Sequence, residues 1–313
     1  MLRFAVSAAT LGLVIALSSP AVAKTKIGIV VETLGNPYFA CLKKAAEEEA
    51  AKHPDVELSV IGAATGTDLA GMTRMIEDTV QKKVDVLAFS AIDPNAMIST
   101  ATKVKNSGVK VLIHSDDLAQ QVADHFIGPD QQAGEAAVAR TAARSLGGKG
   151  KVAILEGVPG NMSSELRKKG AQEAFKDFPG IEVVGVWAAN WDRAQGLQKA
   201  EDILTAHPDI AAIIAVNDEM ALGALQAVKA RNKLGKILIT GFNGVPEAIK
   251  HVDKGDLLAT VLTYCDAVGR QIVLTGMDMA AGSDKAKGYT IDTGTIPLDT
   301  KLVKTVGAAL GAK

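Results

Sequence analysis

The chain has 313 residues, 48% of them hydrophobic and 22% charged, so it is long enough for two domains with sizeable cores. A formal net charge of −1 leaves no basic surplus for nucleic acid, and the sequence has no polybasic run for a membrane surface. We therefore expect a neutral or modestly polar small-molecule partner and no nucleic acid.

The first 23 residues are predicted to be a secretory signal peptide. Arg3 precedes an apolar stretch through Leu17, and Ala21-Val22-Ala23 forms a small-residue cleavage site. A membrane anchor is the alternative, but the apolar run is short and ends in Ser-Ser-Pro. No cysteine that could accept a lipid follows, and no later segment has the roughly 20 apolar residues of a membrane span. Cleavage after Ala23 therefore predicts a soluble, exported protein.

Short apolar runs alternate with amphipathic segments through the rest of the chain. The runs are rich in Val and Ile and mostly unbroken, which is typical of strands buried on both faces. We predict strands at residues 26–31, 56–61, 84–89, 109–113, 151–155, 181–186, 210–216, 236–240 and 257–262. This alternation predicts βαβ units, and so many strands fit two doubly wound parallel-sheet domains better than one sheet.

The segment HFIGPDQQAG, residues 125–134, follows four predicted βα units and precedes four more. No low-complexity linker separates the two halves, so we expect the domains to be joined closely. Ligands of open α/β sheets bind beyond the carboxyl ends of the strands. Two such sheets facing each other predict a ligand cleft between the domains.

The first predicted strand is followed by TLGNPYFACLKK. Asn36 can cap a helix that Pro37 opens, which places Tyr38 and Phe39 at the helix start. These two aromatics are either core residues or an aromatic face for a sugar ring, and we expect at least one of them to be core. Under the second interpretation, the Asn36 amide would bind ligand hydroxyls.

The third and fourth strands also end in polar residues. Ser90 follows one strand, ahead of Asp93, which we interpret as a helix cap rather than a ligand group. His114, Ser115 and Asp116 follow the other, and a carboxylate there suits a polyhydroxylated ligand. A metal site is not expected, because adjacent residues point in different directions and no second histidine or carboxylate pair accompanies them.

Strand ends in the second half carry similar residues. Arg167 lies near the start of a helix and is either a guanidinium at the cleft edge or a surface residue beside two lysines, and the sequence favours neither. Asn217 follows one strand, Phe242 and Asn243 follow the next, and Thr263 follows the last. Asparagine also caps helices, so the aromatic residues are the less expected part of this pattern.

Catalytic and nucleotide-binding motifs are absent from the sequence. GAATGTDLAG lacks the Gly-Lys-Ser/Thr ending of a P-loop, and neither a GxGxxG turn nor a Gly-x-Ser-x-Gly elbow occurs. His114 has no serine or cysteine nucleophile as an obvious partner. We predict no catalytic residues, no metal and no cofactor.

The two cysteines, Cys41 and Cys265, both lie near predicted helix starts. An oxidising compartment permits a disulfide between them. Nothing in the sequence places them together, so two separate buried hydrophobic residues is the favoured interpretation.

Four stretches, TLGNPYFACLK, NWDRAQGL, LTAHPDIAAIIAVNDEMALGAL and ITGFNGVPEAI, resemble the periplasmic sugar-binding proteins of ABC importers, particularly the ribose-binding type. The resemblance covers nearly the whole mature chain. It implies two doubly wound α/β domains joined by a three-segment hinge. The N-terminal lobe would comprise 24–129 plus 264–290, and the C-terminal lobe 130–263 plus 291–313. It also implies a periplasmic monomer that delivers a small neutral sugar or polyol to an inner-membrane ABC permease.

The resemblance implies the ligand contacts Asn36, Tyr38, Phe39, Arg167, Trp191, Asn217 and Phe242. Trp187, four residues before Trp191, has no counterpart among the family's ligand contacts. We interpret it as a packing residue or as a residue at the rim of the cleft. The sequence departs from the ribose type at the further site positions Ser90, Ser115, Asp116, Asn243 and Thr263.

These departures remove an arginine and two carboxylates, and with them charge-assisted hydrogen bonds to particular hydroxyls. They argue against ribose and favour another small pentose, hexose or sugar alcohol. A ligand-presenting partner of a chemoreceptor or sensor kinase is the alternative function, and a secreted enzyme acting on sugars is a third.

Overall fold

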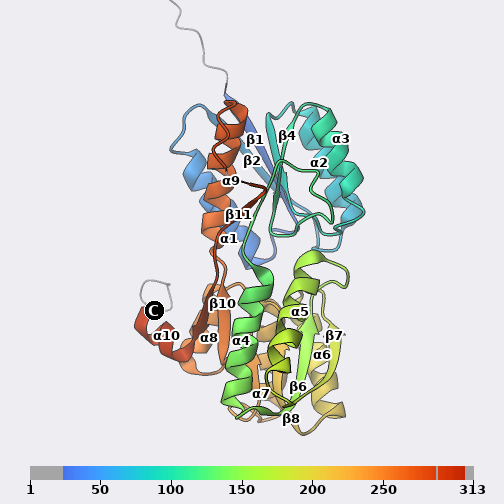
Figure 1. The fold of residues 1–313 in the computed structure, drawn as a ribbon, viewed down its shortest axis with the longest axis vertical. Helices are drawn as coiled ribbons and strands as arrows, with labels where there is room; N and C mark the ends of the chain where they lie inside the picture. Colours follow the sequence, from blue (N-terminus) through green and yellow to red (C-terminus); the bar gives the residue numbers. More distant parts are fainter. Residues whose placement is uncertain (1–23, 287, 307–313) are drawn as a thin grey trace, which may run out of the picture.

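The computed structural model describes residues 24–286 and 288–306, which form two α/β lobes, one above the other in Figure 1. Each lobe contains a six-stranded sheet with helices on both faces. The two doubly wound parallel-sheet domains predicted from the sequence are therefore confirmed. The predicted signal peptide lies outside the described residues. Within the described ranges, no helix combines the length and apolar character needed to cross a bilayer.

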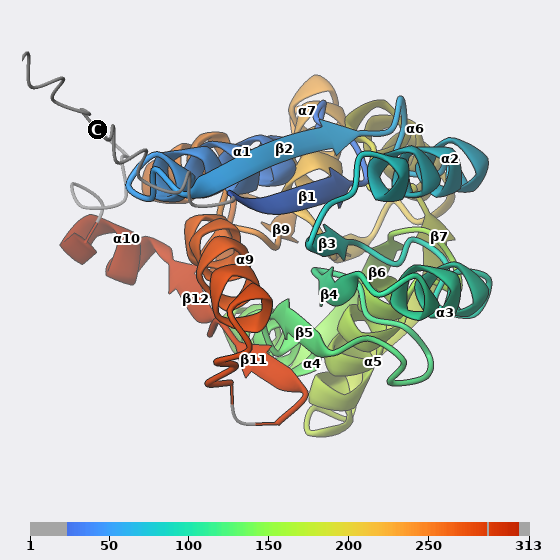
Figure 2. The same ribbon diagram turned by 90° about the horizontal axis from the view of Figure 1, so that it is seen from above.

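The first sheet is parallel throughout, with the strand order β11-β5-β4-β3-β1-β2. Its strands are β1 (Thr25–Val31), β2 (Val56–Gly62), β3 (Val86–Phe89), β4 (Lys110–His114), β5 (His125–Gly128) and β11 (Thr290–Asp292). Its helices are α1 (Pro37–Ala50), α2 (Leu69–Gln81), α3 (Ile98–Asn106) and α9 (Cys265–Ala280). Seen from above in Figure 2, α1 and α9 cover one face of the sheet, and α2 and α3 cover the other.

Alternate residues of one strand serve the two faces of this sheet. In β1, Ile27 and Ile29 pack in the cluster that contains α1 and α9, whereas Val30 packs in the cluster that contains α2 and α3. Both faces are buried, which is why the sequence shows an unbroken apolar run rather than an alternating one.

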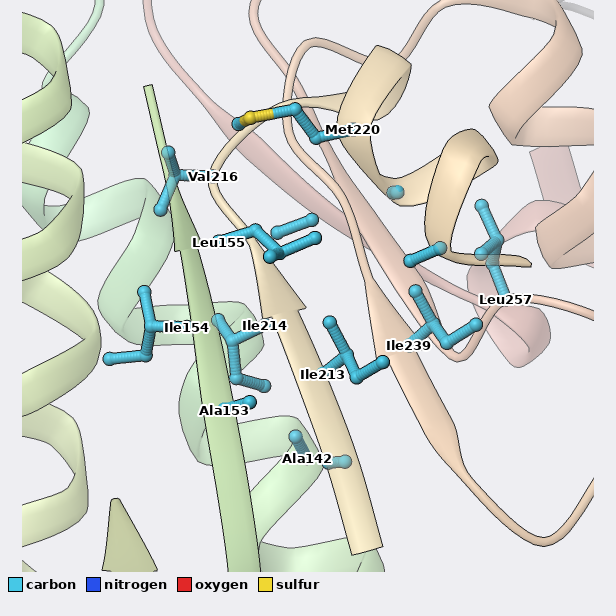
Figure 3. Close-up of a cluster of buried hydrophobic side chains, with 14 of the residues drawn as sticks. Ala142, Ala153, Ile154, Leu155, Ile213, Ile214, Val216, Met220, Ile239 and Leu257 are labelled. Atoms are coloured by element: carbon cyan, nitrogen blue, oxygen red, sulfur yellow. The ribbon is translucent and has the colours of Figure 1, made fainter. Parts of the chain in front are cut away.

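The second sheet has the order β12-β10-β9-β8-β6-β7, with only β12 antiparallel to its neighbour. Its strands are β6 (Lys149–Glu156), β7 (Gly180–Ala188), β8 (Ile210–Ala215), β9 (Leu238–Thr240), β10 (Ala259–Leu262) and β12 (Ile296–Asp299). Its helices are α4 (Gln131–Ser145), α5 (Met162–Lys176), α6 (Arg193–Ala206), α7 (Asp218–Ala230), α8 (Pro246–Lys254) and α10 (Thr300–Val306). Figure 3 shows its core, where Ile154, Ile213 and Ile239 from three neighbouring strands lie near one another.

Three short strands were missed in the sequence, and they mark where the chain passes between the lobes. β5 lies in the segment treated only as a domain border, and β11 and β12 follow the last predicted strand. The chain changes sheets between β5 and β6, between β10 and β11, and between β11 and β12. The boundaries at 129, 264 and 290 stay a prediction, and β11 ends at Asp292, two residues beyond the last of them.

Cys41 and Cys265 form a disulfide bond that joins α1 to α9. The interpretation as two separate buried residues was therefore wrong. At a sequence separation of 224 the chain returns to the first lobe and packs α9 against α1, with 5.9 Å between the two Cα atoms. Only this tertiary return brings the cysteines together, and nothing local to either residue indicates it.

Removing this bond should lower the stability of the protein without changing its fold. The double variant C41A/C265A should lose roughly 2–5 kcal/mol of unfolding free energy, because a very long loop is no longer closed in the unfolded chain. Thermal unfolding measures the loss. Wild-type protein with a thiol reductant is the control and should show a similar drop, and equal midpoints for all samples would contradict the prediction.

Candidate functional site

Residues that follow strands of both sheets line one cavity between the lobes. Its volume is about 340 Å³, including the part open to solvent. The lining residues are Glu32, Asn36, Tyr38, Phe39, Ser115, Asp116, Ser163, Arg167, Trp191, Asn217 and Asn243.

Nine of the twelve predicted site residues line this cavity, and Ser90, Phe242 and Thr263 do not. All three are fully buried behind the wall. The Ser90 hydroxyl donates to Glu32 Oε1 at 2.8 Å, and the Thr263 hydroxyl donates to the Asn243 carbonyl at 3.4 Å. The three residues therefore support residues of the cavity wall from behind.

Two lining residues, Glu32 and Ser163, were missed in the sequence. Glu32 directly follows β1 and is buried, so a carboxylate immediately after a strand was the signal that could have revealed it. Ser163 lies in the first turn of α5. Its backbone N–H donates to Asp116 Oδ1 and its hydroxyl to the Ser115 carbonyl, both at 3.1 Å. These two bonds connect the lobes across the cavity.

Arg167 is buried rather than a surface residue, which resolves the alternative that the sequence left open. Its Nε donates to Gln131 Oε1 and its Nη1 to the Val216 carbonyl, both at 2.8 Å. Its guanidinium carbon lies 3.9 Å from the centre of the Phe242 ring and 5.3 Å from that of Trp191. Two hydrogen bonds and two aromatic faces thus fix the plane of this cation at the cavity wall.

The two tryptophans have different places in the structure. Trp191 lines the cavity in a left-handed backbone conformation with φ of 64°, and a side chain on Gly157 would collide with its ring. Trp187 lies within β7, edge-on to His207 with 6.0 Å between ring centres. Trp187 is not among the lining residues.

The sequence left open whether Tyr38 and Phe39 are core residues or residues of the ligand site, and the structure places them in both settings. Both are buried in the core cluster of α1 and α9, and both also line the cavity. Their rings meet edge to face with 5.2 Å between centres. Burial raises the pKa of Tyr38 to about 12, so its hydroxyl, 3.3 Å from Ser115 Oγ, stays protonated.

Two asparagines at the cavity also cap helices. Asn36 Oδ1 accepts from the backbone N–H of Tyr38 and Asn217 Oδ1 from that of Met220, both at 2.9 Å. The Asn217 amide donates to the Trp191 carbonyl at 3.2 Å. Capping therefore fixes both amide groups in place at the cavity.

Three residues that line the cavity have strained backbone conformations. Ser115 and Asn243, like Trp191, have positive φ values, of 62° and 114° respectively. Such conformations cost about 1–3 kcal/mol each in residues other than glycine and cluster at ligand-binding sites.

Glu135 lies on α4 behind the cavity wall and is fully buried. Neither of its carboxylate oxygens has a hydrogen-bond partner within the described part of the chain. Burial raises the pKa of Glu135 to about 8, although the Arg167 charge acts in the opposite direction. The described residues contain no cluster of side chains that could hold a metal ion.

Two α/β lobes that enclose a polar cavity between their strand ends define a substrate-binding protein. Residues 27–284 match the family described as a periplasmic binding protein domain, and the chain belongs to this family.

Individual relatives cover most of the chain. It is 33% identical over 298 residues to the D-allose-binding periplasmic protein of Escherichia coli K12, covering 93% of this chain and 94% of the relative. It is 36% identical over 262 residues to the ribose import binding protein of Bacillus subtilis 168, covering 83% of each chain. An ABC transporter solute-binding protein from Bacillus halodurans C-125 with bound myo-inositol superposes with a TM-score of 0.85 at 25% identity, covering 93% of this chain and 99% of that one.

Replacing Glu135 should change how stability depends on pH. The folded pKa is raised to about 8, so the native state keeps a proton that the unfolded chain releases, and wild-type stability falls between about pH 5 and 8. E135Q should remove this loss, which is at most about 1.4 kcal/mol per pH unit. The thermal midpoint of E135Q should therefore increase relative to that of wild type as the pH rises. E182Q, at an exposed glutamate of the same lobe, is the control. Parallel pH profiles for E135Q and wild type would contradict the prediction.

Proposed function

We propose that this chain is the periplasmic substrate-binding protein of an ABC importer, which captures one small neutral sugar or sugar alcohol and delivers it to the inner-membrane permease. The observation that carries the proposal is the cavity between the lobes, where amides, an arginine and a carboxylate surround an aromatic face. The names of the compared relatives, with D-allose, ribose and myo-inositol as their ligands, support a ligand of this class.

The cavity residues divide into two kinds of ligand contact. The Trp191 ring and the aromatic pair Tyr38 and Phe39 would pack against the ring or carbon chain of the ligand. Hydroxyls would be bound by the polar lining residues Asn36, Ser115, Asp116, Arg167, Asn217 and Asn243. Capping and stacking hold several of these groups before a ligand arrives, which lowers the entropy lost on binding.

Capture would use closure of the lobes around the ligand. Ser163 of the second lobe donates to Asp116 and Ser115 of the first, so the residues that close the cavity are also its lining. A permease that recognises the two lobes together would then distinguish the loaded from the empty protein.

The residues around the ligand argue for a sugar other than ribose, or for a polyol. Ser115 and Asp116 stand where the ribose type has an Asp-Arg pair, so Arg167 is the single arginine among the lining residues. A site built for particular hydroxyls rejects a ligand that leaves its polar groups unpaired. The compared relatives are binding proteins, which gives no support to a sensor partner or a secreted enzyme.

A thermal-shift screen of sugars and polyols tests the function directly. A bound ligand raises stability by RT ln(1 + [L]/Kd), so the true ligand should raise the unfolding midpoint most. The panel should include D-ribose, D-allose, D-arabinose, myo-inositol and open-chain pentitols. A response to ribose above all others would contradict the ligand preference, and no response to any member would contradict the function.

Trp191 and Trp187 should separate binding from stability. With the panel member that binds most tightly, W191A should weaken binding by about 10-fold or more, because the stacking face at the cavity is lost. W187A should lower the thermal midpoint while the dissociation constant stays close to that of wild type. Calorimetric titration of both variants measures the difference, and equal losses of affinity would refute the division.

A further inference from the structure

Two acidic side chains, Glu32 after β1 and Asp116 after β4, meet at the cavity. The Ser90 hydroxyl lies 2.8 Å from Glu32 Oε1 and 3.3 Å from Asp116 Oδ2. Both carboxyl groups therefore lie within hydrogen-bond distance of the same hydroxyl. Both side chains are about 95% buried, with exposed fractions of 4% for Glu32 and 5% for Asp116.

The hydrogen atoms available here are too few for two carboxylates. Ser90 has a single hydroxyl hydrogen to share between the two, and its shorter contact is to Glu32. Asp116 Oδ1 accepts from the backbone N–H of Ser163, at 3.1 Å. Two buried carboxyl groups that share one hydroxyl are favourable only if one of the two carries a proton.

No cation among the described residues forms an ion pair with either carboxyl group. The Arg167 guanidinium donates to Gln131 and Val216 and has no carboxylate oxygen within 4 Å in the described ranges. Arg193, which lines the adjoining opening of the cleft together with Glu32, is bound by Glu219 and Glu247.

Two further titratable neighbours, His114 and Tyr38, carry no charge at neutral pH. Burial lowers the pKa of His114 to about 4 and raises that of Tyr38 to about 12. Glu219 and Asp192 line the adjoining opening; Glu219 is paired with Arg193, and Asp192 caps α6. No cation in the described ranges therefore forms an ion pair with Glu32, and the Arg167 charge, which lowers the pKa of Glu32, has a weaker effect than burial and Asp116.

We propose that Glu32 is a neutral, protonated residue of the ligand site that donates its proton to Asp116, and that this acid pair selects an uncharged polyhydroxylated ligand over a cationic one. The inference rests on the proposed function and adds that the ligand must be uncharged. One carboxylate, Asp116, then balances the one guanidinium, Arg167, and the cavity is uncharged overall. Burial and the neighbouring Asp116 raise the pKa of Glu32 well above its ordinary range, which agrees with this assignment.

The pair also has a defined effect on the ligand. With Glu32 protonated, its O–H orders the Asp116 carboxylate, whose remaining lone pairs accept ligand hydroxyls. When the proton is lost, two adjacent carboxylates repel each other and the ordered acceptor disappears. Affinity for a neutral ligand should therefore fall as the pH rises, by up to about 10-fold per pH unit above the pKa of the pair.

Glutamine reproduces the protonated state of Glu32, because its amide donates like the acid O–H and its carbonyl accepts from Ser90. The dissociation constant of the best neutral ligand in the panel should be measured for wild type and E32Q between about pH 6 and 9. We expect the wild-type constant to rise across this range and the E32Q constant to change by less than about twofold. E57Q, at an exposed glutamate of the same lobe, is the matched control and should keep the wild-type slope. E135Q tests the other buried acid near Arg167 and should keep the slope too.

A ligand-free measurement separates this inference from the proposed function. In ¹³C NMR spectra of protein labelled at the glutamate carboxyl carbons, one signal that is absent from E32Q should titrate well above the ordinary carboxylate range. If no sugar binds but this signal is found, the proposed function fails and the protonated acid stands. Titration of the Glu32 signal in the ordinary range would overturn the inference. Tighter binding of D-glucosamine than of D-glucose, lost in E32Q, would overturn it as well, because an ionised Glu32 would then bind an amine.

Discussion

The site depends on one buried cation, Arg167. It approaches the cavity from α5, lies over the Phe242 ring, and is held by Gln131 and the Val216 carbonyl. Burying a guanidinium is costly unless its donors and its charge are met. Burial lowers the pKa of Arg167, and the nearby acidic residues Asp116, Glu135 and Asp218 act in the opposite direction. Buried acidic groups therefore gather around this residue in a protein whose net charge is −1.

Much of the fold could be predicted because the hydrophobic pattern of most segments matches the element that each segment forms in the structure. Unbroken Val- and Ile-rich runs mark strands covered on both faces, and nine of the twelve strands were found in this way. β5, β11 and β12 contain no more than two consecutive apolar residues, so no apolar run stands out there. The disulfide between Cys41 and Cys265 was missed because it depends on the chain's return to the first lobe, which no spacing encodes.

The candidate site could be predicted in outline but not in depth. A strand end places a residue at the edge of the sheet, and nine of the predicted residues do line the cavity. Sequence pattern does not say whether such a residue faces the cavity or the layer behind it. Phe242, predicted as a contact, lies against Arg167 and is not among the lining residues, and Glu32 was overlooked beside the prominent helix start at Asn36. Side-chain direction at a strand exit depends on the turn that follows, and several of these turns have unusual backbone angles.

The disulfide has a mechanical consequence for lobe movement. It attaches the first residue of α9 to α1, the helix whose opening turn carries Tyr38 and Phe39. The chain arrives at that anchor directly from β10 of the second lobe, through Thr263 and Tyr264. When one lobe rotates against the other, the backbone angles of this crossing must therefore change in the residues before Cys265. From Cys265 onward, the chain belongs to the first lobe. Lobe closure, as proposed for ligand capture, would therefore bring Arg167 and Trp191 of the second lobe towards Tyr38 and Phe39 of the disulfide-linked first lobe.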